Sequence, residues 1–321
     1  MIFKFTEMQE KKIIEQWGQD MFLNILREIE SCSKKWQLFN LEFYEHYSIN
    51  AIFFCKSEIY GDCVLKIGGY DDEQDFTAQY NVLREYNGGR CYVKAYDVDI
   101  DSAVGKKATL IERVFPGVPL RNEQSLDKRL VVFSELFDGL HIAPAKPELY
   151  FSHIEFLKII TSDCLKENTQ AKNLNIMIEH ADKARELYFN LSEKYNKKML
   201  LHMDLYWGNI ISGGDGRYMI IDPKGVIGDP VFDTGVHLKE ECFKYMEQPE
   251  NIDFMFDYFE KSLNIPNKVL RQIFYIEAVR VKCECHTGLN DEDIRILEFA
   301  ENIMNDRIST TDDTLKYLIT P

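Results

Sequence analysis

The sequence predicts an α+β fold of two lobes, a small N-terminal antiparallel sheet lobe and a larger, mainly helical C-terminal lobe. Its 321 residues suit two units of roughly 150 residues each. Residues 36–67 are aromatic and β-branched with turn residues between the runs, whereas apolar residues after 125 mostly follow helical spacing. The segment Phe115-Pro116-Gly117-Val118-Pro119 breaks the pattern, so we expect lobes at 1–113 and 114–321.

The N-terminal lobe is expected to begin with a helix over residues 10–30, where the apolar side chains recur at helical spacing. Strands should follow within 36–67, joined by turns at 48–50 and 60–62. A helix is predicted over 71–86, because Asn87-Gly88-Gly89 is typical of a helix end. Strands near 92–97 and 108–113 would complete the sheet.

The C-terminal lobe is expected to be helical over residues 125–198, with a break at 143–147. A short strand-rich insert over 199–222 interrupts the helices, and helices return from residue 234 to the end. The larger lobe is therefore a helical body that carries one small β insert.

Composition and charge exclude several classes of protein. The chain is 45% hydrophobic, and 38 basic against 53 acidic residues give a net charge of −15. This sign argues against binding to nucleic acid or an anionic membrane and suits a cationic partner or simple solubility. No apolar run approaches the roughly 20 residues of a membrane span, and the first residues turn charged too early for a signal peptide. We therefore expect a cytoplasmic protein.

The eight cysteines are scattered, which is typical of reduced thiols. Cys283-Glu284-Cys285-His286 has the spacing of metal ligands. It has no second cluster to complete a tetrahedral site, so we do not expect it to bind zinc.

The segment most informative about chemistry runs from residue 200 to residue 225. Two short apolar runs flank the turn residues 213–216, which predicts a hairpin. Such a hairpin would bring Asn209 and Asp222 to one open end, with Asp204 on the loop that leads in. Amide and carboxylate oxygens suit Mg²⁺, and a further carboxylate can take the proton of a substrate hydroxyl. Either aspartate alone could simply cap a turn, but the joint spacing favours phosphoryl transfer.

The pattern His-x-Asp-x-x-x-x-Asn at 202–209, followed by Asp222 beyond a hairpin, resembles the protein-kinase-like fold. His202-Met203-Asp204 is similar to the aminoglycoside phosphotransferase and choline kinase branch. The run IDPKGVIGDPVFD over 221–233 resembles the streptomycin and hydroxyurea phosphotransferases. The resemblance implies a two-lobed ATP-dependent kinase with ATP and Mg²⁺ as cofactors.

Carried over residue by residue, the resemblance implies that Asp204 is the catalytic proton acceptor and that Asn209 and Asp222 are the metal ligands. His202 matches a position that braces this loop, although a purely structural histidine is an equal alternative. Asp233 matches a structural acid that ties the loop backbone.

The nucleotide site is expected in the N-terminal lobe. Lys66, in an apolar strand, resembles the lysine that reaches the nucleotide phosphates, and the backbone from Glu112 to Val114 resembles the segment that binds adenine. The turn that would cover the nucleotide phosphates lacks glycine, so Ser48 and Asn50 would have to contact the phosphates there. The partner of Lys66 stays open between Gln79, Asp75 and Glu85.

The acceptor is expected to be a small, cationic molecule with a hydroxyl group. Four acids of the helical lobe either line the acceptor site or lie on solvated helix faces: Glu240, Glu241, Glu277 and Glu284. Arg280 is near them in the sequence. The leading hypothesis is an antibiotic-resistance kinase for a streptomycin-like aminoglycoside or a related compound. The alternatives are a kinase for a housekeeping sugar, choline-like alcohol or amino alcohol, and a degenerate kinase that only binds nucleotide.

Overall fold

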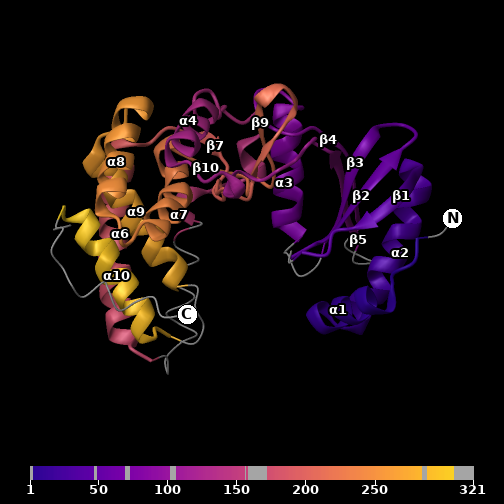
Figure 1. Ribbon diagram of the computed structural model, residues 1–321, viewed down its shortest axis with the longest axis horizontal. Coiled ribbons are helices and arrows are strands. Elements are labelled where there is room, and N and C mark those ends of the chain that lie inside the picture. Colours follow the sequence, from indigo (N-terminus) through magenta and orange to yellow (C-terminus); the bar gives the residue numbers. More distant parts are fainter. Residues whose placement is uncertain are drawn as a thin grey trace. The chain divides into compact units, whose positions relative to one another are not determined.

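The computed structural model describes residues 3–46, 49–68, 73–101, 106–155, 157, 172–283 and 288–306. By its internal contacts the chain divides into a first unit, Met1–Val118 with Ile211–Lys224, and a second unit, Pro119–Ile210 with Gly225–Pro321. The predicted combination of an antiparallel sheet with a mainly helical part is confirmed (Figure 1). The units differ from the predicted lobes because residues 211–224 pack with the first unit.

The first unit is built on a five-stranded antiparallel sheet of order β1-β2-β3-β5-β4. The strands are β1 Leu38–Phe43, β2 Ala51–Ser57, β3 Gly61–Ile67, β4 Ala95–Asp101 and β5 Lys106–Glu112. In the register of β3 with β5, Leu65 lies opposite Leu110 and Ile67 opposite Ala108. β4 begins three residues later than predicted, because Tyr92 forms only an isolated bridge with Ile220.

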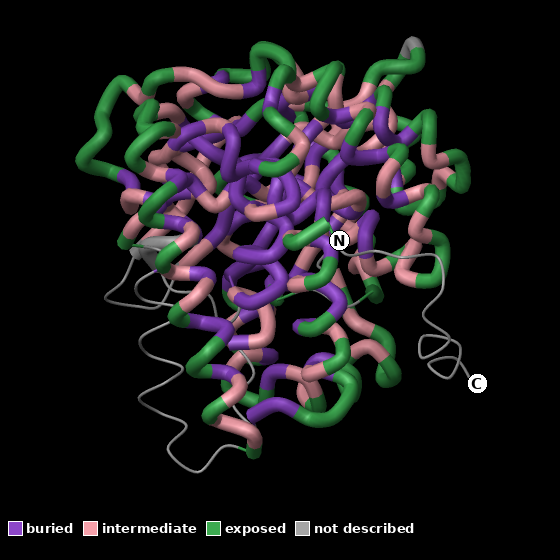
Figure 2. Tube along the Cα trace, turned by 90° about the vertical axis from the view of Figure 1, so that its left-hand side faces the viewer, coloured by how far each residue is buried: buried purple, intermediate pink, exposed green. Residues whose placement is uncertain are grey.

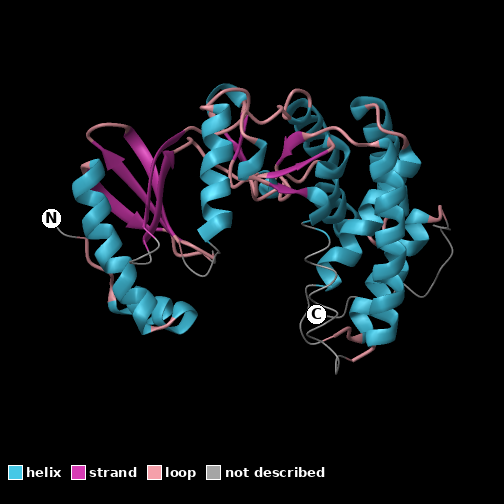
Figure 3. Ribbon diagram, turned by 180° about the vertical axis from the view of Figure 1, so that it is seen from behind, coloured by secondary structure: helices cyan, strands magenta, loops and turns pink. Residues whose placement is uncertain are grey.

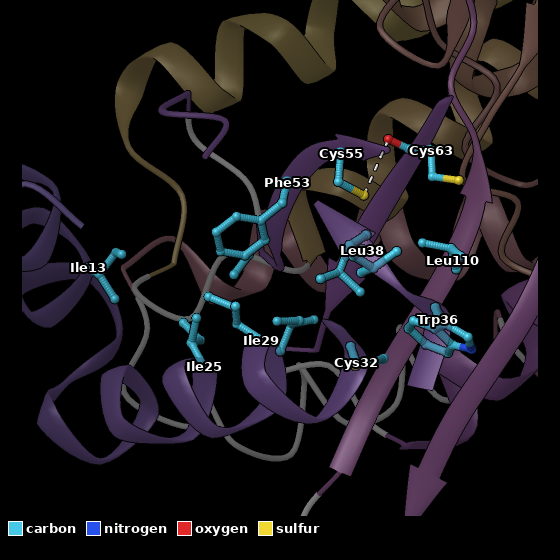
Figure 4. Close-up of a cluster of buried hydrophobic side chains, with 14 of the residues drawn as sticks. Ile13, Ile25, Ile29, Cys32, Trp36, Leu38, Phe53, Cys55, Cys63 and Leu110 are labelled. Carbon is cyan, nitrogen blue, oxygen red and sulfur yellow. Dashed lines mark hydrogen bonds between the residues drawn. The ribbon is translucent and has the colours of Figure 1, made fainter. Parts of the chain in front are cut away.

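One face of this sheet packs against α1 (Glu7–Trp17) and α2 (Gln19–Trp36) (Figure 4). Ile25, Ile29 and Trp36 of α2 pack with Phe53 and Leu65 from the strands. A single helix over 10–30 was predicted, and that prediction is wrong. Gly18, with φ of 85°, lies in the left-handed region that favours glycine and separates the two helices.

The opposite face of the sheet carries the alternate strand residues, among them Lys66, because successive side chains point to opposite sides. Helix α3 (Glu73–Tyr86) meets this face through Gln79, whose side chain bonds to Lys66. The helix ends as predicted, with Asn87 and Gly88 both at positive φ. The first two residues of the predicted helix lie outside the described residues.

The second unit is mainly helical, as Figure 3 shows. Its helices are α4 Leu126–Phe137, α6 Leu174–Lys194, α7 Gly235–Lys244, α8 Pro249–Leu263, α9 Asn267–Cys283 and α10 Asp291–Met304. A three-stranded sheet of order β6-β10-β7 joins Phe151–Ser152, Val226–Gly228 and Met199–Leu201. The predicted hairpin is also present, although all but its first residue belongs to the first unit: β8 (Ile210–Ser212) pairs with β9 (Tyr218–Ile220).

Buried and exposed residues alternate along the helices, so each helix turns one side inward (Figure 2). The six described cysteines, Cys283 among them, are all free thiols. Cys164 and residues 284–287 lie outside the described residues, so the exclusion of a zinc site stays a prediction. Within the described part of the chain, no helix is long and apolar enough to cross a bilayer.

Two histidines of the second unit are buried away from water. Burial lowers the pKa of His153 to about 3, and burial together with the nearby Arg129 guanidinium lowers the pKa of His237 to about 3. The His237 ring stacks on Phe133, with 3.9 Å between ring centroids. Both imidazoles are therefore neutral at pH 7 in the folded protein.

These histidines predict a loss of stability in acid. Between pH 6.5 and about 3 the unfolded chain binds protons that the folded chain rejects, so stability falls as the pH drops through this window. Each histidine contributes a slope of at most about 1.4 kcal/mol per pH unit. His237→Phe should lower the slope measured in urea unfolding at pH 5, 6 and 7 by the contribution of one histidine. His46→Gln, at an exposed histidine, is the control, and an unchanged slope in His237→Phe would contradict the assignment.

Candidate functional site

Lys66 forms a cluster of polar side chains with Gln79 and Asp222 in the first unit. Its side chain is almost fully buried, with 6% exposed. The ammonium donates to Gln79 Oε1 at 2.7 Å and to Asp222 Oδ1 at 3.0 Å. Among the three partners left open by the sequence, Gln79 thus bonds to Lys66, while the acid that reaches the lysine is Asp222.

Asp222 reaches Lys66 because the hairpin that precedes it is attached to the first unit. The N–H of Ile220 donates to the carbonyl of Cys91 at 2.7 Å, and Val93 N–H donates to the Ile220 carbonyl at 3.2 Å. Asp222 itself has φ of 59°, a left-handed conformation that is uncommon outside glycine and clusters at functional sites. The backbone therefore directs this carboxylate at the buried lysine.

The predicted adenine-binding segment is only partly free to bind a base. Glu112 N–H donates to the Lys94 carbonyl at 2.8 Å, and Arg113 N–H donates to the Asp62 carbonyl at 3.3 Å. Within the part of the chain that the structure describes, no group accepts a hydrogen bond from Val114 N–H. Of these three backbone N–H groups, that of Val114 is the one left for a ligand.

The phosphate-covering turn is described in part. Asn50 is buried, with 4% of its surface exposed, directly before β2. Ser48 lies outside the described residues. The proposed phosphate contacts of both residues stay predictions.

Asp233 fixes the backbone of the 202–209 loop in the second unit. Its carboxylate accepts the N–H of His202 at 2.7 Å and that of Met203 at 2.6 Å, and His141 Nε2 lies 2.9 Å from Oδ2. Burial alone would raise the pKa of this carboxyl, but His141 and the loop amides outweigh it and hold the pKa below its usual value. The predicted structural role of Asp233 is confirmed, whereas the sequence analysis missed His141.

The same loop aligns Asp204 with Asn209. Asp204 N–H donates to His202 Nδ1 at 3.1 Å, so the imidazole braces the loop as one of the two alternatives predicted. The Asn209 amide nitrogen donates to the Asp204 carbonyl at 2.9 Å and to its carboxylate at 3.1 Å. Since the nitrogen is engaged, the Asn209 amide offers its oxygen for further binding. Met203, with φ of 58°, gives the loop its turn.

Two of the acids expected to line an acceptor site or to lie on solvated helix faces are buried in ion pairs instead, so both alternatives are wrong for them. Glu241 is fully buried and bonds to Arg129 at 2.7 Å. Glu277 is 5% exposed and bonds to Arg280 at 2.6 Å. Glu240 is half-buried with Lys239 3.4 Å away, and Glu284 lies outside the described residues.

Removing the negative charge of Asp233 should loosen the 202–209 loop. In Asp233→Asn one side-chain oxygen becomes an amide NH2 group, which donates and cannot accept the loop N–H bound at that position, so one buried donor loses its partner. We expect a loss of about 3 kcal/mol in the free energy of unfolding, measured by urea denaturation. Asp182→Asn, which breaks only a partly exposed bond to Arg185, should cost less than about 1 kcal/mol. Equal losses in the two variants would refute this role.

Solved structures of small-molecule kinases share the fold of this chain. A Plasmodium vivax ethanolamine kinase superposes with a TM-score of 0.64 at 13% identity, over 96% of this chain and 98% of that one. The aminoglycoside phosphotransferase APH(4)-Ia, in a complex with ADP and hygromycin B, gives 0.58 at 14% identity, over 89% and 99%. The choline kinase LicA from Streptococcus pneumoniae gives 0.57 at 16% identity, over 90% and 100%.

Sequence comparison identifies the family. No curated protein sequence matches the chain. The sequence profile of the aminoglycoside/hydroxyurea antibiotic resistance kinases, however, matches residues 63–284, which is more than half of the chain. This range includes Lys66, Asp204, Asn209 and Asp222. The chain therefore belongs to the aminoglycoside/hydroxyurea antibiotic resistance kinase family and is a small-molecule phosphotransferase that acts on hydroxyl groups.

Proposed function

We propose that this protein transfers the γ-phosphoryl group of ATP to a hydroxyl group of an aminoglycoside, or of a related cationic compound, and so confers resistance to it. The observation that carries the proposal is the geometry of the 202–209 loop. Asp233 and His202 accept hydrogen bonds from the loop backbone, and Asn209 donates to the Asp204 carboxylate. The family match over residues 63–284 supports the reaction class.

Asp204 is the proposed proton acceptor. The acceptor oxygen attacks the γ-phosphorus, the bond from that phosphorus to the β–γ bridging oxygen breaks, and ADP leaves. The hydroxyl proton passes to the Asp204 carboxylate. Because phosphoryl transfer depends mostly on positioning and on charge neutralisation, a rigid loop serves it directly.

Lys66 and the two proposed metal ligands would bind the nucleotide phosphates. The Asp222 carboxylate and the Asn209 amide oxygen are hard oxygen ligands, which fit Mg²⁺. A bound Mg²⁺ would neutralise charge on the phosphates. Lys66 bonds to Gln79, a neutral amide, and pairs with the Asp222 carboxylate, so a bound nucleotide would engage both charged groups. We further assign the adenine contact to Val114 N–H, the amide of this segment that has no described acceptor.

The acceptor class rests on the family and on charge. The matched family is that of the aminoglycoside/hydroxyurea antibiotic resistance kinases. The net charge of −15 favours approach of a polycationic substrate over long distances. Choline-like alcohols and amino alcohols are the alternative acceptors, and a direct screen separates them.

Replacing the proposed proton acceptor should stop turnover without unfolding the protein. Asp204→Asn keeps the side-chain shape and an acceptor for Asn209, but it removes the base, so kcat should fall by about 10²–10⁴-fold. Acceptor-dependent ADP release should be measured over aminoglycosides, choline and ethanolamine. Asp257→Asn, at an exposed acid of α8, is the matched control.

The screen has decisive outcomes. Release that depends on streptomycin or another aminoglycoside supports the proposed substrate, whereas release with choline or ethanolamine alone supports a housekeeping kinase. Full activity in Asp204→Asn would remove Asp204 from the mechanism. A wild-type protein that releases no ADP with any of these acceptors would refute the proposed function.

Asp222 should couple nucleotide binding to Mg²⁺. Asp222→Asn removes the carboxylate charge, and we expect the Mg²⁺-dependent gain in AMP-PNP affinity to fall by at least about tenfold. Calorimetric titration with and without Mg²⁺ measures this gain directly. Asp62→Asn, which alters a partly exposed acid paired with Lys56, is the control within the same unit. An unchanged gain in Asp222→Asn would exclude Asp222 as a ligand.

A further inference from the structure

A fully buried ion pair lies in the second unit beside the 202–209 loop. It joins Arg129 of α4 to Glu241 of α7, and both side chains have 0% exposure. Arg129 Nε donates to Glu241 Oε1 and Nη2 donates to Oε2, both at 2.7 Å. Two parallel bonds of this kind fix the relative orientation of the two side chains as well as their distance.

All five N–H groups of the Arg129 guanidinium have acceptors. Besides the two bonds to Glu241, Nη2 donates to Tyr245 Oη at 3.0 Å, and Nη1 donates to the carbonyls of Glu123 and Gln124 at 2.9 and 3.1 Å. Burial favours the neutral form of the guanidinium, but the bonds to Glu241 and Tyr245 outweigh this and raise its pKa. The guanidinium is therefore charged at neutral pH, and each of its N–H groups is engaged.

Glu241 also contacts the 202–209 loop directly. The indole N–H of Trp207 donates to Glu241 Oε1 at 3.0 Å, and the Trp207 carbonyl accepts the N–H of Arg121 at 3.3 Å. Arg129 and Lys244 each lie 5.2 Å from the centroid of the Trp207 ring, within the range of cation–π attraction. Trp207 is thus held by its indole nitrogen, its carbonyl and its ring.

Trp207 lies between the proposed proton acceptor, Asp204, and the proposed metal ligand, Asn209, in the sequence. It lies three residues after Asp204 and two before Asn209. Two backbone hydrogen bonds of ordinary length connect the loop around it: Tyr206 N–H donates to the Asp204 carbonyl at 3.0 Å, and Asn209 N–H donates to the Tyr206 carbonyl at 2.9 Å. A Cβ at Gly208 would lie 2.5 Å from both the Arg121 side chain and the Tyr206 ring, so a larger residue there would require these side chains to move.

We propose that Trp207, anchored by the buried Arg129–Glu241 ion pair, is a positioning residue that sets the distance between Asp204 and Asn209. This inference rests on the proposed function. Asp233 holds the beginning of the loop, at His202 and Met203, and the ion pair holds its end. A buried ion pair is rarely needed for stability alone, because apolar residues of similar volume often serve as well. The pair supplies what apolar residues lack, a fixed acceptor for the indole.

The first test removes one hydrogen bond. Trp207→Phe keeps an aromatic ring near the two cations and leaves the ion pair intact, but it cannot donate to Glu241. Trp36→Phe is the matched control, because the Trp36 indole also donates to a carboxylate, that of Asp97 at 2.8 Å, and lies in the first unit. We expect kcat to fall about tenfold in Trp207→Phe, with KM for ATP within about twofold of wild type. Trp36→Phe should retain the wild-type kcat.

A second measurement does not depend on catalysis. Hydrogen exchange of the Tyr206 and Asn209 amides should accelerate at least about tenfold in Trp207→Phe and stay unchanged in Trp36→Phe. If exchange in both variants equals that of wild type, the anchoring claim is overturned even where no acceptor substrate is known. If wild type is active and the two variants have equal kcat, the positioning role is overturned while the proposed function stands.

A third variant tests the ion pair without leaving a buried charge. Arg129→Met together with Glu241→Leu removes both charges, and its folding is checked by thermal denaturation. We expect it to lower kcat as Trp207→Phe does. Adding Trp207→Phe to it should then change kcat by less than about twofold, because all three substitutions break the same link. Multiplicative losses would show that the ion pair and Trp207 act independently, which contradicts the proposal.

Discussion

The carboxylate of Asp233 is the constraint on which the candidate site depends. It receives the backbone N–H groups of His202 and Met203 and the imidazole of His141, and it is buried with 1% exposure. A buried carboxylate is tolerated only when its oxygens are satisfied, so folding around Asp233 forces the loop backbone toward it. That backbone carries the left-handed Met203 and then Asp204, so the direction of the proposed proton acceptor follows from the burial of Asp233.

In the first unit the lysine is oriented by a neutral partner. Gln79 Oε1 accepts a bond from Lys66 but does not neutralise its charge, and the charge is met instead by Asp222 at 3.0 Å. An acid at position 79 would compete for the ammonium, because a charged acceptor binds it more strongly than an amide does. With glutamine there, Lys66 and Asp222 form the main charge pair, and a nucleotide would engage both groups. The partner of Lys66, which the sequence left open, is thus a glutamine together with an aspartate distant in sequence.

Local sequence patterns predicted those parts of the fold and the site that depend on residues close together in the sequence. Alternation and turn residues predicted the sheet strands, and the glycines at 213–216 predicted the hairpin that carries Asp222. Gly18 was missed because the apolar spacing continues across it, so periodicity alone concealed the break between α1 and α2. The bond from Trp207 to Glu241 was missed for another reason. It spans 34 residues, and the ion pair behind it spans 112, which no local pattern reveals.

The buried acids also change how the number of acidic residues in the chain should be interpreted. Glu241 and Glu277 are among the 53 acidic residues, yet each is paired with an arginine within 2.7 Å, so neither pair contributes to the net charge of −15. A neutralised, buried pair has little field at a distance, so neither acid can attract a cationic acceptor. Attraction of the acceptor must come from acids that keep solvent contact, and Glu241 instead serves the geometry of the loop. A glutamate such as Glu241 can thus position the loop without contacting the substrate. A count of charges cannot distinguish such a positioning role from substrate binding.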